Sequence, residues 1–177
     1  NDTQDNGIFE AKEQIGFRIC QDRRLNRIFL TMSIGQSGRQ RLAGNIEVVG
    51  FAYAVDCNQD GQCDTWGGGR HLIWAVDSDN DNMLDVHLDT NDDGLIDLSD
   101  DSNHDNRITV ADGAAINPPV ALDKVKAVRV WLLAVSSGPL ADYCDNQIRL
   151  VGDRIIPAPG DQYRRMVMDT IVDCRNL

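Results

Sequence analysis

The sequence predicts a mainly β protein, an antiparallel sheet in one domain over residues 1–177, with an acidic insert at residues 77–112. Runs rich in β-branched and aromatic residues recur along the chain, separated by turns that contain Gly, Ser and Asn. Helix signals are scarce, and only Leu122–Lys126 favours a single helical turn. The 177 residues, 42% of them apolar, suffice for one hydrophobic core. We therefore expect one β domain and no second domain.

The first half of the chain supplies a predicted hairpin and two further strand candidates. Gln14–Cys20 and Leu25–Met32 flank a polar turn and are expected to pair. A loop rich in Gly and Ser follows over Ser33–Arg41. Leu42–Val55 is a β-rich run with partial alternation of apolar residues, and His71–Val76 is another short strand.

The second half contains the longest β candidate, Ala121–Ser136. Apolar residues alternate with Arg129 and Trp131 in its middle, and the run becomes fully apolar towards its end. This pattern predicts a central strand that is buried on both faces. Ile148–Ile156 and Tyr163–Cys174 complete the predicted set of strands.

The negative charge of the chain is confined to one segment. The formal net charge is −11. Residues 56–112 hold 15 Asp, no Glu and two Arg, whereas the rest of the chain holds 13 acidic and 15 basic residues. The overall acidity argues against nucleic-acid binding. An excess of short carboxylates in one segment indicates a site that uses them.

The five cysteines form no Cys-x-x-Cys pair. Cys57 and Cys63 are close in sequence, and Cys144 and Cys174 flank the C-terminal region. We interpret both pairs as disulfides, which predicts an oxidising compartment, and we assign no partner to Cys20. Five reduced thiols in a cytosolic protein are the alternative.

The insert is a threefold repeat with a period of twelve residues. Loop one begins at Asp77, loop two at Asp89 and loop three at Asp101. Positions 1, 3 and 5 are Asp or Asn in every copy, and position 8 is Leu or Ile. Position 9 is Asp or Thr, and position 12 is Asp in loops two and three but Leu88 in loop one. Position 6 is Gly or Asn, the residues that best tolerate positive φ, which predicts a sharp turn there.

Calcium binding explains each of these positions. Ca²⁺ takes about six to eight oxygen ligands at about 2.3–2.6 Å. Side chains at positions 1, 3, 5, 9 and 12 and the carbonyl of position 7 supply such a set, while position 8 packs away from it. The expected ligands are Asp77, Asp79, Asp81, Met83 and Asp85 in loop one, Asp89, Asn91, Asp93, Leu95, Asp97 and Asp100 in loop two, and Asp101, Asn103, Asp105, Arg107, Thr109 and Asp112 in loop three. Magnesium is the hard-ion alternative, although it prefers fewer protein ligands.

Two loops depart from the full pattern. Loop one lacks an acid at position 12, and we expect it to share the carboxylate of Asp89. An outlying loop has the pattern through position 9 but Gly67 at position 12, and we expect it to bind more weakly than loops two and three. The predicted Cys57–Cys63 disulfide would clamp this outlying loop. Its expected ligands are Asp56, Asn58, Asp60, Gln62 and Asp64.

No catalytic constellation is evident, and the protein is not expected to be an enzyme. The sequence has no Gly-x-Ser-x-Gly, no His-Glu-x-x-His and no P-loop. The three histidines are dispersed, and His87 and His104, beside the loop carboxylates, are expected to be exposed to solvent. The three tryptophans are expected to pack in the core or along strands rather than to form a sugar-binding platform.

The insert resembles two known kinds of calcium loop. Its tandem arrangement resembles thrombospondin type 3 repeats, and the spelling Asp-x-Asn-x-Asp-Gly-x-Ile-Asp-x-x-Asp of loop two resembles dockerin loops. The resemblance implies the metal ligands alone. Cohesin binding is not carried over, because the sequence lacks the dockerin helices.

Outside the insert the chain resembles type IV minor pilins of the PilW-like class. Three segments carry the resemblance in the family's order: Leu42–Tyr53, Val125–Ser136 and Tyr163–Leu177, which ends in Arg-Asn-Leu. They resemble the entry into the family's central strand, its most recognisable strand and its C-terminal strand. Together they cover about a quarter of the chain.

The resemblance implies the globular head of a pilin-like subunit that acts by assembly or adhesion with other pilin subunits. The expected location is the cell surface or the extracellular space, after anchoring in the inner membrane on its periplasmic side. Pilins begin with a long hydrophobic helix, which would make the fold α+β; we expect it upstream of Asn1 or on a separate chain. The resemblance also implies that Cys144 and Cys174 staple the C-terminal region. The alternatives are a J-like pseudopilin of type II secretion and a calcium-dependent adhesin or carbohydrate-binding module, which requires an open coordination position.

Overall fold

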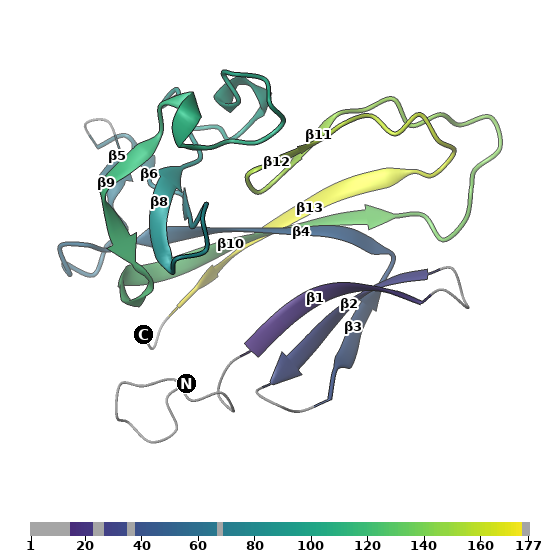
Figure 1. Cartoon of the computed structure of the whole chain (residues 1–177), viewed down its shortest axis with the longest axis horizontal. Coiled ribbons are helices and arrows are strands. Elements are labelled where there is room, and N and C mark those ends of the chain that lie inside the picture. Colours follow the sequence, from purple (N-terminus) through teal and green to yellow (C-terminus); the bar gives the residue numbers. More distant parts are fainter. Residues whose placement is uncertain (1–14, 23–26, 35–37, 67–68, 175–177) are drawn as a thin grey trace.

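A computed structural model describes residues 15–22, 27–34, 38–66 and 69–174. Its main feature is a six-stranded antiparallel sheet in the order β13-β10-β4-β7-β8-β9 (Figure 1). These strands are β4 (Ile46–Val55), β7 (Ala75–Val76), β8 (Met83–His87), β9 (Ala115–Ala121), β10 (Val125–Val135) and β13 (Arg165–Asp173). The prediction of a mainly β, antiparallel fold is confirmed.

Three smaller sheets accompany the main one. They are the antiparallel sheet of β1 (Ile15–Asp22), β2 (Arg27–Ile34) and β3 (Gln40–Gly44), the pair of β5 (Thr65–Trp66) and β6 (His71–Leu72), and the hairpin of β11 (Arg149–Val151) and β12 (Arg154–Ile156). In Figure 1 the β11–β12 hairpin lies above the long strands β4, β10 and β13, and the three-stranded sheet lies below them. The long strands therefore form the middle layer of the molecule.

Helical structure in the described residues is limited to three short 3₁₀ turns. They are η1 (Leu98–Asp100), η2 (Val110–Asp112) and η3 (Leu122–Lys124), the last of which confirms the single turn expected there. No helix in the described ranges is long and apolar enough to cross a membrane.

Most of the strand predictions are confirmed, with three runs divided, of which Ile148–Ile156 becomes the hairpin of β11 and β12. The N-terminal hairpin forms between β1 and β2. The Leu42–Val55 run breaks at Asn45, whose φ of 59° is incompatible with a continuous strand, so β3 and β4 join different sheets. The His71–Val76 run likewise divides into β6 and β7.

Two strands of the main sheet lie where none was predicted. β8 runs between loops one and two, so the acidic insert contributes a strand to the sheet. β9 contains Pro118 and Pro119, which cannot donate ladder hydrogen bonds, and it is accordingly an edge strand.

Strand β10 is central, as predicted, but it is not buried on both faces. Its inner face, carrying Ala127, Trp131 and Leu133, is buried, whereas Val128, Val130 and Leu132 on the outer face are only partly covered. The expectation of full burial is wrong because the β11–β12 hairpin and the acidic loops cover the inner face, whereas the opposite face is covered only in part, by Phe17 of β1 on Phe51 of β4 and by the second core cluster at Val128.

Two glycines allow the hairpin to approach the sheet. A Cβ on Gly50 of β4 would lie 2.7 Å from the backbone nitrogen of Gly152. Because only glycine permits this backbone contact, Val151 enters the same buried cluster as Leu133. Trp74 and Trp131 also join that cluster and Trp66 packs against the second one, which confirms the packing role expected for them.

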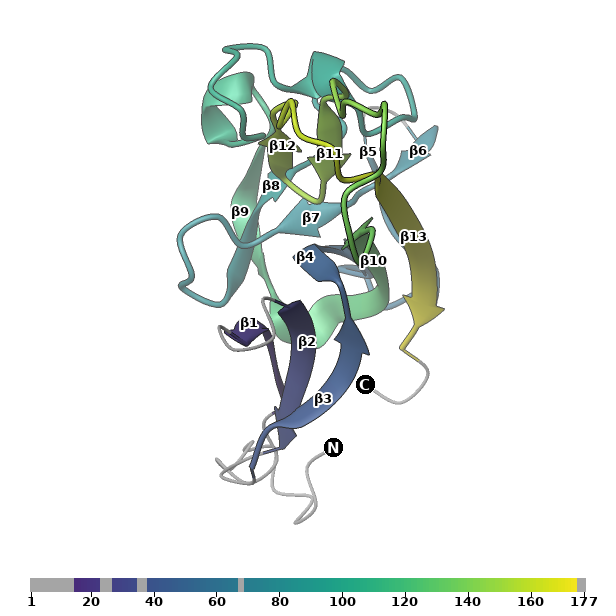
Figure 2. The ribbon, with the colours of Figure 1, turned by 90° about the vertical axis from the view of Figure 1, so that its right-hand side faces the viewer.

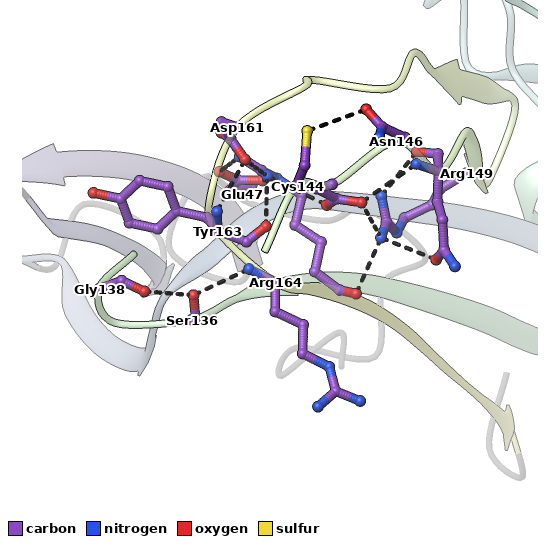
Figure 3. Close-up of polar contacts among 12 residues, drawn as sticks. Glu47, Ser136, Gly138, Cys144, Asn146, Arg149, Asp161, Tyr163 and Arg164 are labelled. Atoms are coloured by element: carbon purple, nitrogen blue, oxygen red, sulfur yellow. Dashed lines mark hydrogen bonds and ion pairs between the residues drawn. The ribbon is translucent and has the colours of Figure 1, made fainter. Parts of the chain in front are cut away.

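A buried ion cluster fixes the chain between β10 and β13. Asp145 has no exposed surface, and it accepts from Arg149 at 2.8 Å and from Arg165 at 3.4 Å. Arg165 also binds Glu47 of β4 and Asp161 (Figure 3). Burial raises the pKa of Asp145, but the hydrogen bonds from Arg149, the Gln147 N–H and Arg165 outweigh it and hold that pKa below its usual value. Through the Arg165–Glu47 pair, the cluster ties the segment between β10 and β13 to β4.

Candidate metal centre

The acidic loops are the connections at the ends of short strands. The outlying loop follows β4, loop one joins β7 to β8, loop two follows β8, and loop three precedes β9. Loop one is therefore separated from loops two and three by the length of β8 (Figure 2). The expectation that loop one shares Asp89 is wrong, because that residue lies beyond the far end of β8 and begins loop two.

All four loops share one hydrogen-bond scheme. The position 1 carboxylate accepts the position 5 N–H through Oδ1 and the position 6 N–H through Oδ2, at 2.9–3.3 Å. Oδ1 of position 3 accepts the same position 5 N–H at 2.9–3.2 Å. Oδ1 of position 5 accepts the position 7 N–H at 2.8–2.9 Å. The backbone of each loop thus gathers the first three predicted ligand side chains at one turn.

Left-handed residues make this turn possible. Position 6 has positive φ in every loop, as predicted, at Gly61, Asn82, Gly94 and Asn106. Position 4 is also left-handed in every loop, at Gln59, Asn80, Asp92 and His104. The second feature was not predicted, although Asn80, Asp92 and His104 are of types that are enriched in this conformation.

The loops close in two different ways. In loop two, Asp100 at position 12 accepts from the Thr90 N–H at 2.6 Å and the Asp97 N–H at 2.8 Å. In loop three, Asp112 accepts from the Asn103 N–H at 3.1 Å, one position later than Thr90 in loop two, and from the Thr109 N–H at 2.8 Å. These two acids therefore lie where the pattern of Asp at position 12 predicted a closing carboxylate.

In the two loops without an acid at position 12, the position 9 carboxylate closes the turn. Asp85 accepts from the Ser78 N–H at 2.8 Å in loop one, and Asp64 accepts from the Cys57 N–H at 2.7 Å in the outlying loop. These loops are thus complete turns of nine residues. The sequence did not indicate this second mode of closure.

Position 8 packs into the core in all four loops. Leu84 and Ile108 have no exposed surface, and Ile96 and Cys63 pack against the larger core cluster. Loop three is also tied to the β11–β12 hairpin, because the Arg107 Nε lies 2.7 Å from Asp153 and the Ile108 N–H donates to the Asp153 carbonyl. The loops are therefore fixed to the domain on the side away from their carboxylates.

Carboxylates crowd together within the loops. In loop one, oxygens of Asp77, Asp79 and Asp81 lie within 4.8 Å of one another. The Asp81 N–H lowers the pKa of Asp79, but desolvation and the charges of Asp81, Asp85 and Asp77 outweigh it and raise that pKa. In loop two, burial raises the pKa of Asp100 despite its hydrogen bonds. A cation bound among these groups would remove the repulsion.

A histidine not predicted to take part contacts loop two. His71 Nδ1 lies 3.0 Å from Asp92 and 4.0 Å from Asp89. A Cβ on Gly94 would lie 2.9 Å from the His71 ring, so glycine at this turn also provides room for the ring. His71 therefore connects the β5–β6 pair to loop two, a tertiary contact that no local sequence signal indicates.

The two histidines expected to be exposed differ. His104 is exposed, which confirms the prediction, whereas His87 has no exposed surface and the prediction for it is wrong. His87 lies on β8 with its ring 4.9 Å from the Trp66 ring, and its Nδ1 accepts the Trp74 N–H at 3.2 Å. Burial lowers the pKa of His87, and the Trp74 carbonyl, 3.4 Å from Nδ1, and the neighbouring acidic residues only partly oppose this.

Neither predicted disulfide forms, and all five cysteines are free thiols. Cys63 occupies position 8 and packs inward, whereas Cys57 at position 2 is exposed, so the two point to different sides of the turn. Cys144 lies near the start of β13, because the backbone N–H of the adjacent Asp145 donates to the Asp161 carbonyl. Cys174 lies beyond the end of β13. Nine strand residues at about 3.3 Å each place these two sulfurs roughly 30 Å apart.

The donor set of the loops is composed of oxygen. The converging side chains are Asp, Asn and Thr, and the His71 imidazole lies at the edge of loop two. Carboxylate and amide oxygens suit hard cations such as Ca²⁺ and Mg²⁺ rather than metals that prefer sulfur or nitrogen. Comparison of the chain with protein families, with curated proteins and with solved structures finds no match.

Proposed function

We propose that this chain is the head of a type IV pilus subunit, or of a subunit of a pilus-like filament, that acts by assembly at the cell surface and is stabilised by calcium. The observation that carries the proposal is an apolar sheet surface that the described part of the chain leaves partly exposed. We call this surface the outer face; it comprises Val128, Val130 and Leu132 of β10 and Met166, Met168 and Val172 of β13. The sequence resemblance to PilW-like pilins supports the same reading.

The register of the sheet places these residues on one side. Leu132 pairs with Met168 of β13 and with Val49 of β4, and Val128 pairs with Val172. Residues directly opposite each other in an antiparallel pair point to the same face. Exposed fractions of 57% for Met166, 41% for Met168 and 52% for Val172 leave an apolar patch of the kind that marks an interaction site.

The size of the outer face suits a helix. An α-helix with its side chains is about 10 Å across, so the two strands of the outer face, about 4.8 Å apart, fit beneath one helix. The hydrophobic N-terminal helix that the pilin resemblance implies would bury these side chains, whether it precedes this chain or comes from a neighbouring subunit. In the proposal, assembly brings that helix onto the outer face.

Calcium is proposed to occupy loops one, two and three. Loops two and three offer carboxylate, amide or hydroxyl oxygens at positions 1, 3, 5, 9 and 12, and loop one offers four aspartates, of which Asp85 closes the turn. The number of carboxylates favours Ca²⁺ over Mg²⁺, which retains more of its water. Because loop three is tied to the β11–β12 hairpin through Asp153, calcium would also hold the cover of the inner face.

Assembly is tested by charging the outer face. In the cell that makes this protein, Met168→Glu should lower the amount of the chain in sheared surface filaments at least tenfold without lowering its total amount, because a carboxylate cannot be buried unpaired against an apolar helix. Leu140→Glu is the matched control, since Leu140 has the same 41% exposure but lies in the loop after β10. Unchanged incorporation of Met168→Glu, or absence of the wild-type chain from filaments, would refute the proposal.

Calcium is tested separately on the purified protein. Excess chelator should lower the melting temperature and increase protease cleavage between Asp77 and Asp112, because the loop carboxylates then repel one another. Added calcium should reverse both changes, and added magnesium at the same concentration should do so less effectively. An identical digestion pattern with and without chelator would rule out the calcium part of the proposal.

The alternative of a type II secretion pseudopilin would use the same outer face for assembly. The two alternatives are distinguished by whether the chain enters a pilus or a type II secretion filament. The adhesin alternative requires a coordination position that is open to an external ligand. Asp100 and Asp112 close loops two and three from within the chain. This closure favours a structural role for calcium.

A further inference from the structure

The outlying loop differs from the other three in having a lysine at its position 1 carboxylate. The Lys126 Nζ lies 3.6 Å from Oδ2 of Asp56, whose side chain is 3% exposed. The same oxygen accepts the Gly61 N–H at 3.0 Å, and the other carboxylate oxygen accepts the Asp60 N–H at 3.1 Å. The ammonium group thus approaches the carboxylate that would be the first ligand of a metal in this loop.

The position of Lys126 beside the outlying loop is determined by an irregularity in strand β10. Val125 pairs with Val55, but Ala127 pairs with Ala54, so Lys126 is the extra residue of a β-bulge in β10. A bulge redirects the side chain of the extra residue. The backbone is held on both sides, because the Lys126 carbonyl accepts the Cys174 N–H at 2.6 Å and the Lys124 carbonyl accepts the Asp56 N–H at 2.9 Å.

The equivalent carboxylates of the other loops have no such partner in the described ranges. Neither Asp77 nor Asp101 forms an ion pair with a Lys or Arg there, and Asp89 has only the His71 ring at 4.0 Å. The outlying loop has a lower negative charge than loops one and two. It has three aspartates at its side-chain ligand positions, whereas loops one and two have four each. Loop three has three aspartates but no lysine.

We propose that Lys126 is the resident cation of the outlying loop and excludes calcium from it. This inference rests on the proposed binding of calcium by loops one to three. A calcium ion bound to Asp56 would lie about 2.3–2.6 Å from its oxygen, within a few ångströms of the ammonium, and the two cations would repel each other. The outlying loop therefore keeps the calcium-loop conformation at any calcium concentration, and Lys126 determines which loops bind the metal.

The experiment counts calcium ions per chain by native mass spectrometry of the purified protein over a calcium titration. The wild type should reach a count one lower than Lys126→Met, because removing the ammonium leaves the carboxylates of the outlying loop without a cation. Lys126→Arg keeps the charge and should match the wild type. Lys124→Met should match it too, since the Lys124 ammonium lies near the exposed Asp123 and not at Asp56.

Two further variants locate the additional ion, and the second of them does not contain Lys126→Met. Adding Asp60→Asn to Lys126→Met should remove the additional calcium, because Asp60 is a ligand position of the outlying loop. Asp60→Asn alone should leave the wild-type count unchanged. This residue is exposed, and an asparagine oxygen can still accept the Gln62 N–H.

The outcomes separate the two proposals. If the wild type binds calcium and Asp60→Asn alone lowers the count by one, the outlying loop already holds calcium and the role of Lys126 is overturned. The same holds if folded Lys126→Met binds no additional ion. If neither the wild type nor Lys126→Met binds calcium, the calcium part of the proposed function fails, and the inference fails with it.

Discussion

Asp100 is the most informative residue for testing the metal centre, because its side chain has a structural role that calcium would extend. It has no exposed surface and accepts hydrogen bonds from the Thr90 N–H at 2.6 Å, the Asp97 N–H at 2.8 Å and the Thr90 hydroxyl at 3.1 Å. Asp100→Asn keeps the size of the side chain and removes one acceptor oxygen. The variant therefore changes the chemistry of loop two without creating a cavity.

Without calcium, the expected cost of Asp100→Asn is that of one buried donor left without an acceptor. If the asparagine oxygen accepts from Thr90, its amide group faces the Asp97 N–H, and two donors oppose each other. Leaving a buried polar group unpaired costs about 1–3 kcal/mol. Part of this is offset, because burial raises the pKa of Asp100 and the neutral amide needs no desolvation of a charge. The loss of unfolding free energy in chelator should lie in the lower half of that range.

With calcium, the same variant should lose more. A ligand that binds only the folded state stabilises it by about 2.7 kcal/mol when its concentration is 100 times its Kd. Removing the closing carboxylate of loop two should remove most of that contribution for one site. The destabilisation by Asp100→Asn should therefore be about 2–3 kcal/mol larger in calcium than in chelator.

Urea unfolding of wild type and variant, each in excess chelator and in saturating calcium, measures both quantities. Asp123→Asn is the control, because that carboxylate has a 72% exposed side chain and lies outside the loops. An equal loss in both solutions would show that Asp100 closes the loop but does not bind calcium. No loss in either solution would refute the hydrogen-bond argument as well.

Three further substitutions test the fold around the site. Gly50→Ala should cost about 1–3 kcal/mol in urea unfolding, because its Cβ would lie 2.7 Å from backbone, whereas Gly38→Ala, with open space around it, should cost nothing measurable. Ile108→Ala should cost about 2–5 kcal/mol, and Leu95→Ala, 61% exposed at position 7 of loop two, should change stability by no more than about 0.5 kcal/mol. Asp145→Asn should cost about 3 kcal/mol at neutral pH, because it leaves the buried charge of Arg149 without its carboxylate partner. The lowered pKa of Asp145 means that its contribution is present above the ordinary Asp pKa of about 4 and is lost as the pH falls below it, so the stability of the variant should vary less with pH in that range.

The long strands could be predicted because each is long enough for an excess of apolar residues to be recognised in the sequence. β10 and β13 are runs of nine or more residues with apolar side chains in excess; β10 has one buried face, whereas β13 lies at the edge of the sheet and is largely exposed. β5, β6 and β7 have two residues each, which is too short for an alternating pattern to appear. The two prolines of β9 indicate a loop locally, and only its edge position makes a strand compatible with them.

The features of the candidate site that depend only on residues close together in the sequence could be predicted. The repeat gave the positions of the carboxylates, the left-handed residue at position 6 and the buried residue at position 8, because each depends on neighbours within one turn. His71, His87 and Lys126 could not be placed in this way. Each meets its loop or its buried environment through a separate strand, and a sequence pattern with a period of twelve contains no information about that pairing.

The two modes of loop closure suggest why a strand separates loop one from loop two. A loop that closes at position 9 releases the chain three residues earlier than one that closes at position 12. In loop one, closure by Asp85 leaves Val86 and His87 free to pair with β7, and β8 can form before loop two begins at Asp89. Loop two closes at Asp100, and loop three begins at the next residue, so no strand fits between them. The identity of the residue at position 12 therefore sets both the composition of the proposed metal site and the connection between loops. Leu88 occupies position 12 of loop one and is fully buried. This residue therefore contributes to the hydrophobic core instead of supplying a metal ligand.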